Sequence, residues 1–265
     1  MSTYRVTLEY DGTAYSGWQW QPSVATVEGA VRGALERLTG ERPQLSAAGR
    51  TDAGAHAHGQ VIGLTLQRSW AADRLRLGLD AQLPRDITAR AVAVAPPSFH
   101  ARFDAVDRTY RYLVTARRSR PAVTRKYVWS VSGPLDVSAM CAAARLLKGR
   151  HDFAGFGRAP RLNGSTVRTI HQVRVRRLHS MQPDAADVLL IDVRADAFLY
   201  GMMRTIAGAL VSVGEGKLTE DQVATLLSNP AEVGRPIVAP AHGLHQWSVS
   251  YPAAAIAQPD STENP

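Results

Sequence analysis

The sequence has few of the features that common kinds of site require. Its 265 residues include one cysteine, Cys141, so an internal disulfide is excluded and a reducing, cytoplasmic setting is expected. Cys141 lies in an apolar run without a basic neighbour, which predicts a buried, unreactive thiol. We expect no signal peptide and no membrane association, because no uninterrupted apolar run reaches the length of a membrane span.

Cofactor and metal motifs are missing as well. The chain has no P-loop and no dinucleotide-binding fingerprint, and Gly155-Phe156-Gly157 is too short a match to count as one. Asp52, His56 and His58 are close in sequence, but they lack the helical histidine pair or cysteine set of most metal centres. We therefore expect neither a cofactor nor a metal ion.

Acidic residues are scarce in the middle of the chain. Residues 106–200 hold 17 basic and 7 acidic residues, whereas residues 1–105 carry a net charge of +1 and residues 201–265 one of −3. Seven basic residues and no acidic one lie between Arg108 and Lys126, where Tyr110 and Tyr112 are interleaved with them. A solvated basic surface is one interpretation, but this concentration favours a polyanion. Tyrosine with arginine suits looped RNA, whose bases stack and whose phosphates form ion pairs.

Hydrophobic periodicity predicts an α+β fold made of two halves with similar patterns. In residues 1–105, the N-terminal half, helices are expected at 27–38 and 75–83, with Thr26 as an N-cap and Gly40 as a stop. Strands are expected at 4–10, 44–48, 59–66 and 86–95. The resulting order, β-α-β-β-α-β, is that of a split βαβ, or ferredoxin-like, unit.

Residues 106–252, the C-terminal half, repeat this pattern without repeating the sequence. The expected helices are 136–147, 198–213 and 219–227, the last with a capping box of Thr219 and Gln222, and the expected strands are 109–115, 127–131, 169–178, 188–194 and 244–250. Two such units would form one broad antiparallel sheet with helices on one face. Residues 253–265, rich in Ala and Pro at first and polar at the end, predict a disordered tail.

Residues 49–56 read Gly-Arg-Thr-Asp-Ala-Gly-Ala-His and place one carboxylate, Asp52, in a segment too tight for a helix. Taken alone, an Asp beside Gly favours a structural turn, because such residues commonly form one. Arg50, two residues earlier, would favour the charged form of the carboxylate. Asp52 is therefore also a candidate nucleophile or general base that needs no cofactor.

Arg204 lies in an expected helix that is apolar on nearly every side. An unpaired charge in such a helix is too costly to bury, so either Arg204 reaches solvent at the end of the helix or it binds an anion. Asp52 is the best candidate for that anion. Tyr110 and Tyr112 are two apart on an expected strand and share one side of it, where they pack in the core or stack on a base.

With these residues in hand, the chain resembles the tRNA pseudouridine synthase A (TruA) family from Tyr4 to Tyr251. The most specific match is residues 48–56, with Ala55 where Val is usual. The other matching segments are Tyr10-Asp11-Gly12-Thr13, Gly17-Trp18-Gln19, Phe99-His100-Ala101-Arg102-Phe103, Tyr110-Arg111-Tyr112, His151-Asp152-Phe153 and Phe198-Leu199-Tyr200 with Met202-Met203-Arg204.

The resemblance implies the pseudouridine synthase fold and a cofactor-free, metal-free homodimer that isomerises uridines 38, 39 and 40 of the tRNA anticodon arm. It implies that Asp52 is the essential aspartate, that Tyr110 packs against the target base and that Arg204 forms an ion pair with Asp52. Arg50 and His56 resemble motif residues near the flipped nucleotide. Further substrate-binding residues are expected in the basic segment: Arg108, Arg111, Tyr112, Arg117 and Arg118.

The chain departs from the family pattern at Gly201, where His or Asn is common, at Met203, where Val is common, and at residues 155–157, where Ser-Phe-Arg is frequent. Gly201 and Gly157 would suit an alternative function, a tRNA-binding module or folding aid without turnover. A third hypothesis is a metal-dependent RNA hydrolase that uses Asp52, His56 and His58. Since Asp52, Tyr110 and Arg204 are all present, the isomerase is favoured.

Overall fold

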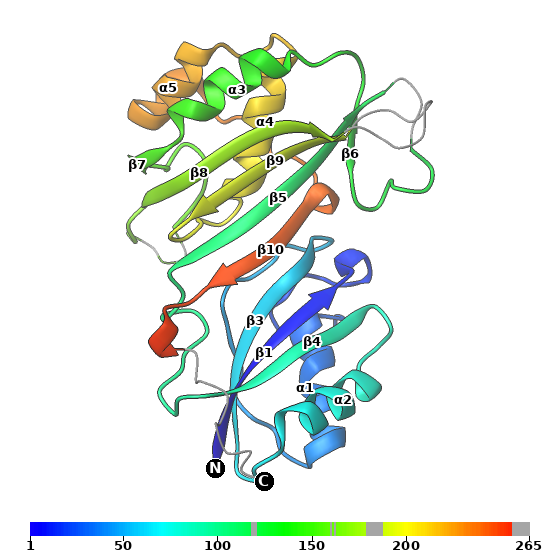
Figure 1. The fold of residues 1–265 in the computed structure, drawn as a ribbon. Coiled ribbons are helices and arrows are strands. Elements are labelled where there is room, and N and C mark those ends of the chain that lie inside the picture. Colours follow the sequence, from blue (N-terminus) through cyan, green and yellow to red (C-terminus); the bar gives the residue numbers. More distant parts are fainter. Residues whose placement is uncertain (118–120, 160, 162, 179–187, 256–265) are drawn as a thin grey trace, which may run out of the picture. The chain divides into compact units, whose positions relative to one another are not determined.

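The computed structural model describes residues 1–117, 121–159, 161, 163–178 and 188–255 (Figure 1). It confirms the predicted fold class, a mixed α+β protein with one broad, mostly antiparallel sheet and helices. The chain divides into two compact units, here called unit 1 (Met1–Val106 and the residues from Trp247 on) and unit 2 (Asp107–Gln246). This division differs from the predicted halves, because the residues from Trp247 to 252 belong to unit 1 rather than to the second half.

Unit 1 has the predicted β-α-β-β-α-β order. Its elements are β1 (Ser2–Tyr10), α1 (Val27–Thr39), β2 (Ser46–Ala47), β3 (His56–Leu66), α2 (Ala72–Gln82) and β4 (Ile87–Ala95). The strands follow the order β4-β1-β3, the short β2 also pairs with β3, and each of these pairs is antiparallel. A split βαβ unit has this arrangement, because β3 lies between the strands that α1 connects.

The core of unit 1 lies between its sheet and its two helices, of which α1 is partly hidden behind β4 in Figure 1. Alternate residues of β1 point into this core, as do Val31 and Leu35 of α1 and Leu75 and Leu79 of α2. The predicted ends of α1 are confirmed: the Thr26 side chain accepts a hydrogen bond from the Gly29 N–H, and Gly40 has a left-handed φ of 73°.

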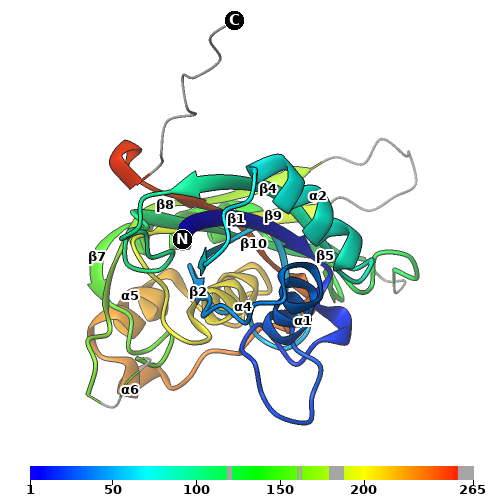
Figure 2. The ribbon, with the colours of Figure 1, turned by 90° about the horizontal axis from the view of Figure 1, so that it is seen from below.

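Unit 2 repeats the topology of unit 1. Its elements are β5 (Asp107–Ala116), β6 (Trp129–Val131), α3 (Val137–Leu146), β7 (Gly149–Asp152), β8 (Val167–Leu178), β9 (Val188–Ala195), α4 (Met202–Gly214), α5 (Glu220–Ser228), α6 (Pro230–Val233) and the first residues of β10 (Leu244–Ser250). The strand order β10-β5-β9-β8 corresponds to β4-β1-β3-β2, with β7 added beside β8. In Figure 2, α4 and α5 lie on the same side of β8 and β9.

Several expected elements differ from those observed. The helix expected from Phe198 begins at Met202, because Gly201 has a φ of 77° and Tyr200 pairs with Arg158 in an isolated antiparallel bridge. β7 and α6 were not predicted. Ala253–Ala255 forms a short 3-10 helix although disorder was expected there, and the rest of the predicted tail, 256–265, is outside the described residues. Among the described residues, no helix is both long and apolar enough to cross a membrane.

Candidate active site

Asp52 is at the first position of a tight turn. The Ala55 N–H donates a 3.0 Å hydrogen bond to the Asp52 carbonyl oxygen, and Gly54 has a φ of 79°. A turn that requires a left-handed residue accommodates glycine there without strain. The Asp52 side chain is half-buried and Arg50 is exposed. The carboxylate is therefore presented by a turn rather than by a helix or strand, as the motif predicts.

The loop between β1 and α1 holds this turn by main-chain hydrogen bonds. The Trp18 N–H donates to the carbonyl oxygen of Thr51 at 3.0 Å, and the Gly54 N–H donates to that of Tyr15 at 3.2 Å. A side-chain bond adds to them, since the hydroxyls of Tyr10 and Thr51 are 2.8 Å apart and buried. Residues on both sides of Asp52 are thus fixed to one loop, which limits the motion of the carboxylate.

Two glycines allow this loop to approach the turn. A Cβ atom at Gly12 would overlap the carbonyl oxygen of Ala55, and one at Gly17 would lie 2.8 Å from the carbonyl oxygen of Thr51. Gly17 also has a φ of 89°, which other residues adopt only with strain. Both glycines lie in segments that match the family pattern. The reason for them, close approach of the loop to the turn, is visible only in the structure.

His56 is buried and anchors the start of the same loop. Its Nδ1 atom is 3.1 Å from the Asp11 carboxylate and 3.2 Å from the Gly12 backbone nitrogen. A protonated Nδ1 would donate to Asp11, whereas an unprotonated Nδ1 would accept from the Gly12 N–H, so the two contacts belong to different proton positions. Asp11 also accepts from the Thr13 N–H at 2.9 Å. This geometry supports a role for His56 in shaping the loop.

Gln60 holds the other end of the motif, and sequence reasoning missed it. Its side chain is fully buried in β3, and its Nε2 atom donates to the carbonyl oxygen of Gly49 at 2.7 Å. Its Oε1 atom accepts from the Val61 N–H. A glutamine directly before the apolar residues Val61 and Ile62 of a strand is the signal that could have identified it, because a buried amide needs partners.

Arg204 is in the first turn of α4 and is half-buried. Its Nε atom donates a 2.7 Å hydrogen bond to the carbonyl oxygen of Ala239, and the Ala239 N–H donates back to the Arg204 carbonyl oxygen at 3.2 Å. The guanidinium is thereby oriented by the segment that precedes β10. One of its five N–H donors is used in the bond to Ala239.

Tyr112 supports this segment from β5. It is fully buried, and its hydroxyl donates to the carbonyl oxygen of Pro240 at 2.6 Å. Burial raises the pKa of Tyr112 well above its ordinary value, and the positive charge of Arg204 opposes part of that rise. The hydroxyl therefore stays neutral, and the geometry favours a structural role for Tyr112 rather than the predicted contact with tRNA.

Tyr110 shares the buried side of β5 with Tyr112, as their spacing predicts. It is 6% exposed, and its ring meets that of Phe198 edge to face with the centroids 4.7 Å apart. Such an arrangement fixes the plane of the tyrosine ring. The Tyr110 ring is thus held in one orientation against Phe198, close to the start of α4.

Several cations of the predicted basic segment bind protein groups. Arg108 is buried and donates to the carbonyl oxygen of Asp196 at 2.7 Å. Arg111 binds one oxygen of the buried Asp192 carboxylate at 2.8 Å, while Arg176 binds the other at 2.8 Å. These contacts favour structural roles for Arg108 and Arg111. Arg117 is half-buried, and Arg118 lies outside the described residues.

The departures at Gly155, Gly157 and Gly201 have local structural reasons. A Cβ at Gly155 would be 2.6 Å from the carbonyl oxygen of Leu226, and one at Gly157 would be 2.7 Å from the Cβ of Leu199. Gly201 is the left-handed residue that precedes α4. The small residues at 155 and 157 therefore permit close packing within unit 2.

Comparisons with known proteins show the family of the chain. A family model described as tRNA pseudouridine synthase matches residues 7–104 and 143–252. The chain belongs to the tRNA pseudouridine synthase family. Its members are isomerases that convert uridine to pseudouridine in tRNA. Asp52 and Arg204 lie within the matched segments, whereas Tyr110 lies between them.

Relatives resemble the chain over nearly its whole length. It is 41% identical over 266 aligned positions to a tRNA pseudouridine synthase A of Chloroflexus aurantiacus, covering 100% of this chain and 95% of the relative. It is 40% identical to one of Methylobacterium nodulans, covering 98% and 100%, and 38% identical to one of Roseiflexus sp., covering 100% and 96%. The match thus includes both units.

Proposed function

We propose that this chain isomerises uridine to pseudouridine at positions 38, 39 and 40 of the tRNA anticodon arm, with Asp52 as its catalytic carboxylate. The observation that carries the proposal is the braced turn of Asp52 in a chain whose relatives, matched from end to end, are named tRNA pseudouridine synthase A. The three positions come from the resemblance to the TruA family.

The chemistry requires a positioned carboxylate and no change of oxidation state. Uridine and pseudouridine are isomers: the N1–C1′ bond breaks, the uracil turns, and a C5–C1′ bond forms. The proton on C5 leaves to solvent while N1 gains one, so atoms and electrons balance without a redox partner. Asp52 attacks C1′, attacks C6 or abstracts the 2′ proton, and these three routes remain open alternatives.

Arg204 is proposed to form an ion pair with Asp52. A guanidinium beside a carboxylate stabilises its charged form and orients it by charge-assisted hydrogen bonds. The bond from Arg204 to Ala239 supports this role, because it sets the direction of the side chain through Nε.

Tyr110 is proposed to stack on the uracil after the nucleotide leaves the RNA helix or loop. Flipping a base costs a few kcal/mol, and an oriented aromatic ring recovers part of that cost. The contact between Tyr110 and Phe198 supports the proposal, because it fixes the ring before the base arrives. Tyr110 would also hold the detached uracil while it turns.

The other predicted substrate-binding residues are proposed in two groups. Arg50, which is exposed next to the Asp52 turn, Arg117 and Arg118 are proposed to bind phosphates of the tRNA. His56, Tyr112, Arg108 and Arg111 act as supports of the site through the contacts described above. We further propose a homodimer in the cytoplasm that needs no metal or cofactor.

The test uses tRNA with tritium at C5 of its uridines, incubated with the protein in the absence and in the presence of a chelator. Tritium release measures bond formation at C5, and tRNAs with uridine at only one of positions 38, 39 and 40 identify the sites. Release that Asp52→Asn abolishes, and that the exposed-site control Asp73→Asn retains, would support the proposal. Tight binding without release would instead favour the tRNA-binding module, and release that stops with the chelator would reveal a metal requirement.

A further inference from the structure

The loop that braces the Asp52 turn also presents an exposed tryptophan. Trp20 is 55% exposed, whereas Trp18, two residues earlier, is 2% exposed and packs in the core of unit 1. Single exposed apolar side chains are common on protein surfaces, so exposure alone assigns no role to Trp20, and the way its position is fixed has to carry the argument. The support of Trp20 is therefore informative.

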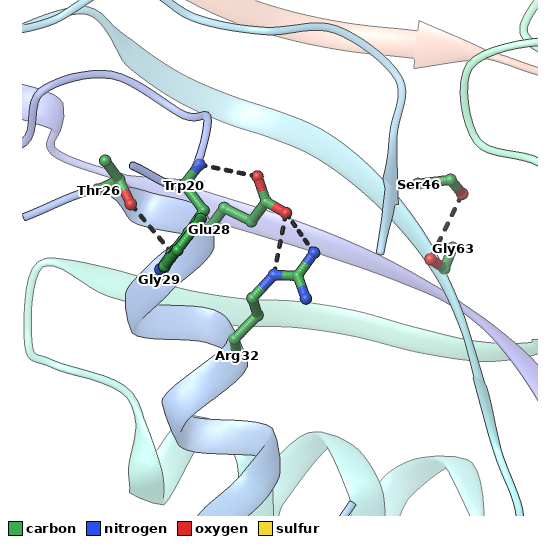
Figure 3. Close-up of polar contacts among 7 residues, drawn as sticks. All are labelled: Trp20, Thr26, Glu28, Gly29, Arg32, Ser46 and Gly63. Carbon is green, nitrogen blue, oxygen red and sulfur yellow. Dashed lines mark hydrogen bonds and ion pairs between the residues drawn. The ribbon is translucent and has the colours of Figure 1, made fainter. Parts of the chain in front are cut away.

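Glu28 fixes the backbone of Trp20 to the first turn of α1. The Trp20 N–H donates to Oε2 of Glu28 at 2.9 Å, and Oε1 of Glu28 accepts from Nε and Nη2 of Arg32 at 3.0 and 2.7 Å (Figure 3). The Glu28 side chain is only 12% exposed, so both of its oxygens are used in a largely buried setting. The position of Trp20 is thus set by a bonded carboxylate rather than by a free loop.

The indole ring of Trp20 packs against Gly29 of α1. A Cβ atom at Gly29 would lie 3.2 Å from Cδ1 of Trp20, so a side chain at this position would press against the ring. Thr26 caps the helix on the same turn by accepting from the Gly29 N–H at 3.2 Å (Figure 3). One side of the indole therefore rests on the helix, and the rest of its surface remains available for contact.

The hydrogen bonds that position Trp20 are connected to those that position the Asp52 turn. The Glu28 N–H donates to the carbonyl oxygen of Trp18 at 2.9 Å, and the Trp18 N–H donates to that of Thr51 at 3.0 Å. Within unit 1, Trp20 is thus joined to Trp18 through Glu28, and Trp18 is joined by a main-chain bond to Thr51, the residue before Asp52. A ligand that contacts the Trp20 indole would therefore be held at a defined position relative to the Asp52 carboxylate.

We propose that the Trp20 indole stacks on an unpaired base of the tRNA substrate and positions the RNA for Asp52. This inference rests on the proposed function, since it takes the anticodon arm as the ligand. Stacking on an aromatic ring is a common way in which proteins hold unpaired RNA bases. Trp20 is a positioning residue and takes no part in bond making.

Steady-state kinetics with the tritium assay tests this role. Base stacking predicts that Trp20→Ala raises KM for tRNA by about 5- to 150-fold and leaves kcat unchanged. Trp20→Phe, which keeps an aromatic face, should recover much of the loss. The control Leu77→Ala removes another exposed apolar side chain of unit 1, 58% exposed on α2, and should leave KM unchanged.

Two further measurements separate the alternatives. If KM for Trp20→Ala equals that of the wild type, or if a lower unfolding temperature accounts for its loss of activity, the indole only packs against α1 and the proposal is overturned. If sedimentation shows that Trp20→Ala dissociates a dimer, the surface binds a second copy instead. Direct tRNA binding gives a readout without turnover, so a failure of the isomerase assignment remains distinguishable from a failure of the Trp20 contact.

Discussion

The backbone N–H of Trp18 donates a 3.0 Å hydrogen bond to the carbonyl oxygen of Thr51, and this bond joins the loop after β1 to the residue before Asp52. Together with the bond from Gly54 to Tyr15, it fixes both sides of the turn. Positioning of a reacting group is a large contributor to catalysis, so a shift of about 1 Å can cost roughly 100-fold in rate. The predictions below test this loop and the groups around it.

Gly17→Ala should destabilise the protein and lower its activity. A side chain at φ of 89° is strained by about 1–2 kcal/mol, and its Cβ would also lie 2.8 Å from the Thr51 carbonyl oxygen. Gly40→Ala is the matched control, because Gly40 has a φ of 73° but open space around it. Thermal unfolding should show a larger loss for Gly17→Ala. Equal losses would mean that the contact with Thr51 is easily relieved.

Arg204 and Asp52 should be energetically coupled if they form the proposed ion pair. A double-mutant cycle of Asp52→Ala and Arg204→Ala, followed by chemical unfolding, should give a coupling of about 1 kcal/mol or more. The two single changes should each lower the rate, and Arg204→Lys should recover only part of it because the Nε bond to Ala239 is lost. A coupling near zero would show that the two residues act separately.

Asp192→Asn should lower the free energy of unfolding by about 1–3 kcal/mol. The buried carboxylate binds Arg111 and Arg176, and the amide would leave these guanidinium groups with a weaker acceptor. Asp221→Asn, at an exposed position on α5, provides the control. Urea unfolding measures both. A stability like that of the wild type would show that the pair with Arg111 contributes little, and Arg111 would again be a candidate for RNA binding.

Arg117→Ala should weaken tRNA binding in a salt-dependent way. Loss of one phosphate contact reduces the slope of log affinity against log salt by about one. Arg111→Ala is the comparison, because the carboxylate of Asp192 already binds its guanidinium. Binding is measured between low and physiological salt. If Arg117→Ala has the salt slope of the wild type while Arg111→Ala does not, the roles assigned to the two residues must be exchanged.

Tyr112 should make the protein sensitive to alkali. Because burial raises its pKa above the ordinary 10.0, the folded state keeps the proton after the unfolded chain has lost it. The stabilisation is complete below pH 10 and is lost as the pH rises through 10 toward the pKa of the folded state. Tyr112→Phe should cost about 1 kcal/mol at neutral pH but flatten the alkaline decline.

Unfolding by urea at a series of pH values checks this expectation. Tyr200→Phe, which changes a tyrosine that is 60% exposed, is the control and should follow the wild-type decline. If Tyr112→Phe also follows it, another group causes the alkaline loss. Tyr15 is the first candidate, because burial and the nearby Asp86 raise its pKa too.

Local signals in the sequence were sufficient for much of the fold. The caps of α1, Thr26 and Gly40, and the capping box of α5 are confirmed because each involves residues only a few positions apart. The start of α4 was wrong because the apolar residues before Gly201 continue the helical period, and only the left-handed φ of that glycine separates them from the helix. β7 was missed because its residues, Gly149–Asp152, are polar and form a strand only by pairing with β8.

In the candidate site, too, local features could be predicted and contacts between distant residues could not. The turn at Asp52 follows from Asp and Gly at neighbouring positions, which is local information. The bond from Gln60 to Gly49 and the contact of His56 with Asp11 join residues far apart in sequence, so no local pattern specifies the partner. The same holds for Arg111, whose charge suggested RNA binding before its partner Asp192 was known.

The bracing of the Asp52 turn has a consequence for how this region tolerates mutation. Every amino acid except proline supplies a backbone N–H and a carbonyl group, so the bonds from Trp18 and Gly54 do not depend on the side chains present. Gly12 and Gly17 are restricted, because any side chain there would occupy space taken by the turn, and Gly54 is restricted by its φ of 79°. A library that varies the exposed residues between Gly12 and Gly17 should therefore retain activity in many clones, whereas clones that have lost either of these two glycines should be absent from the survivors.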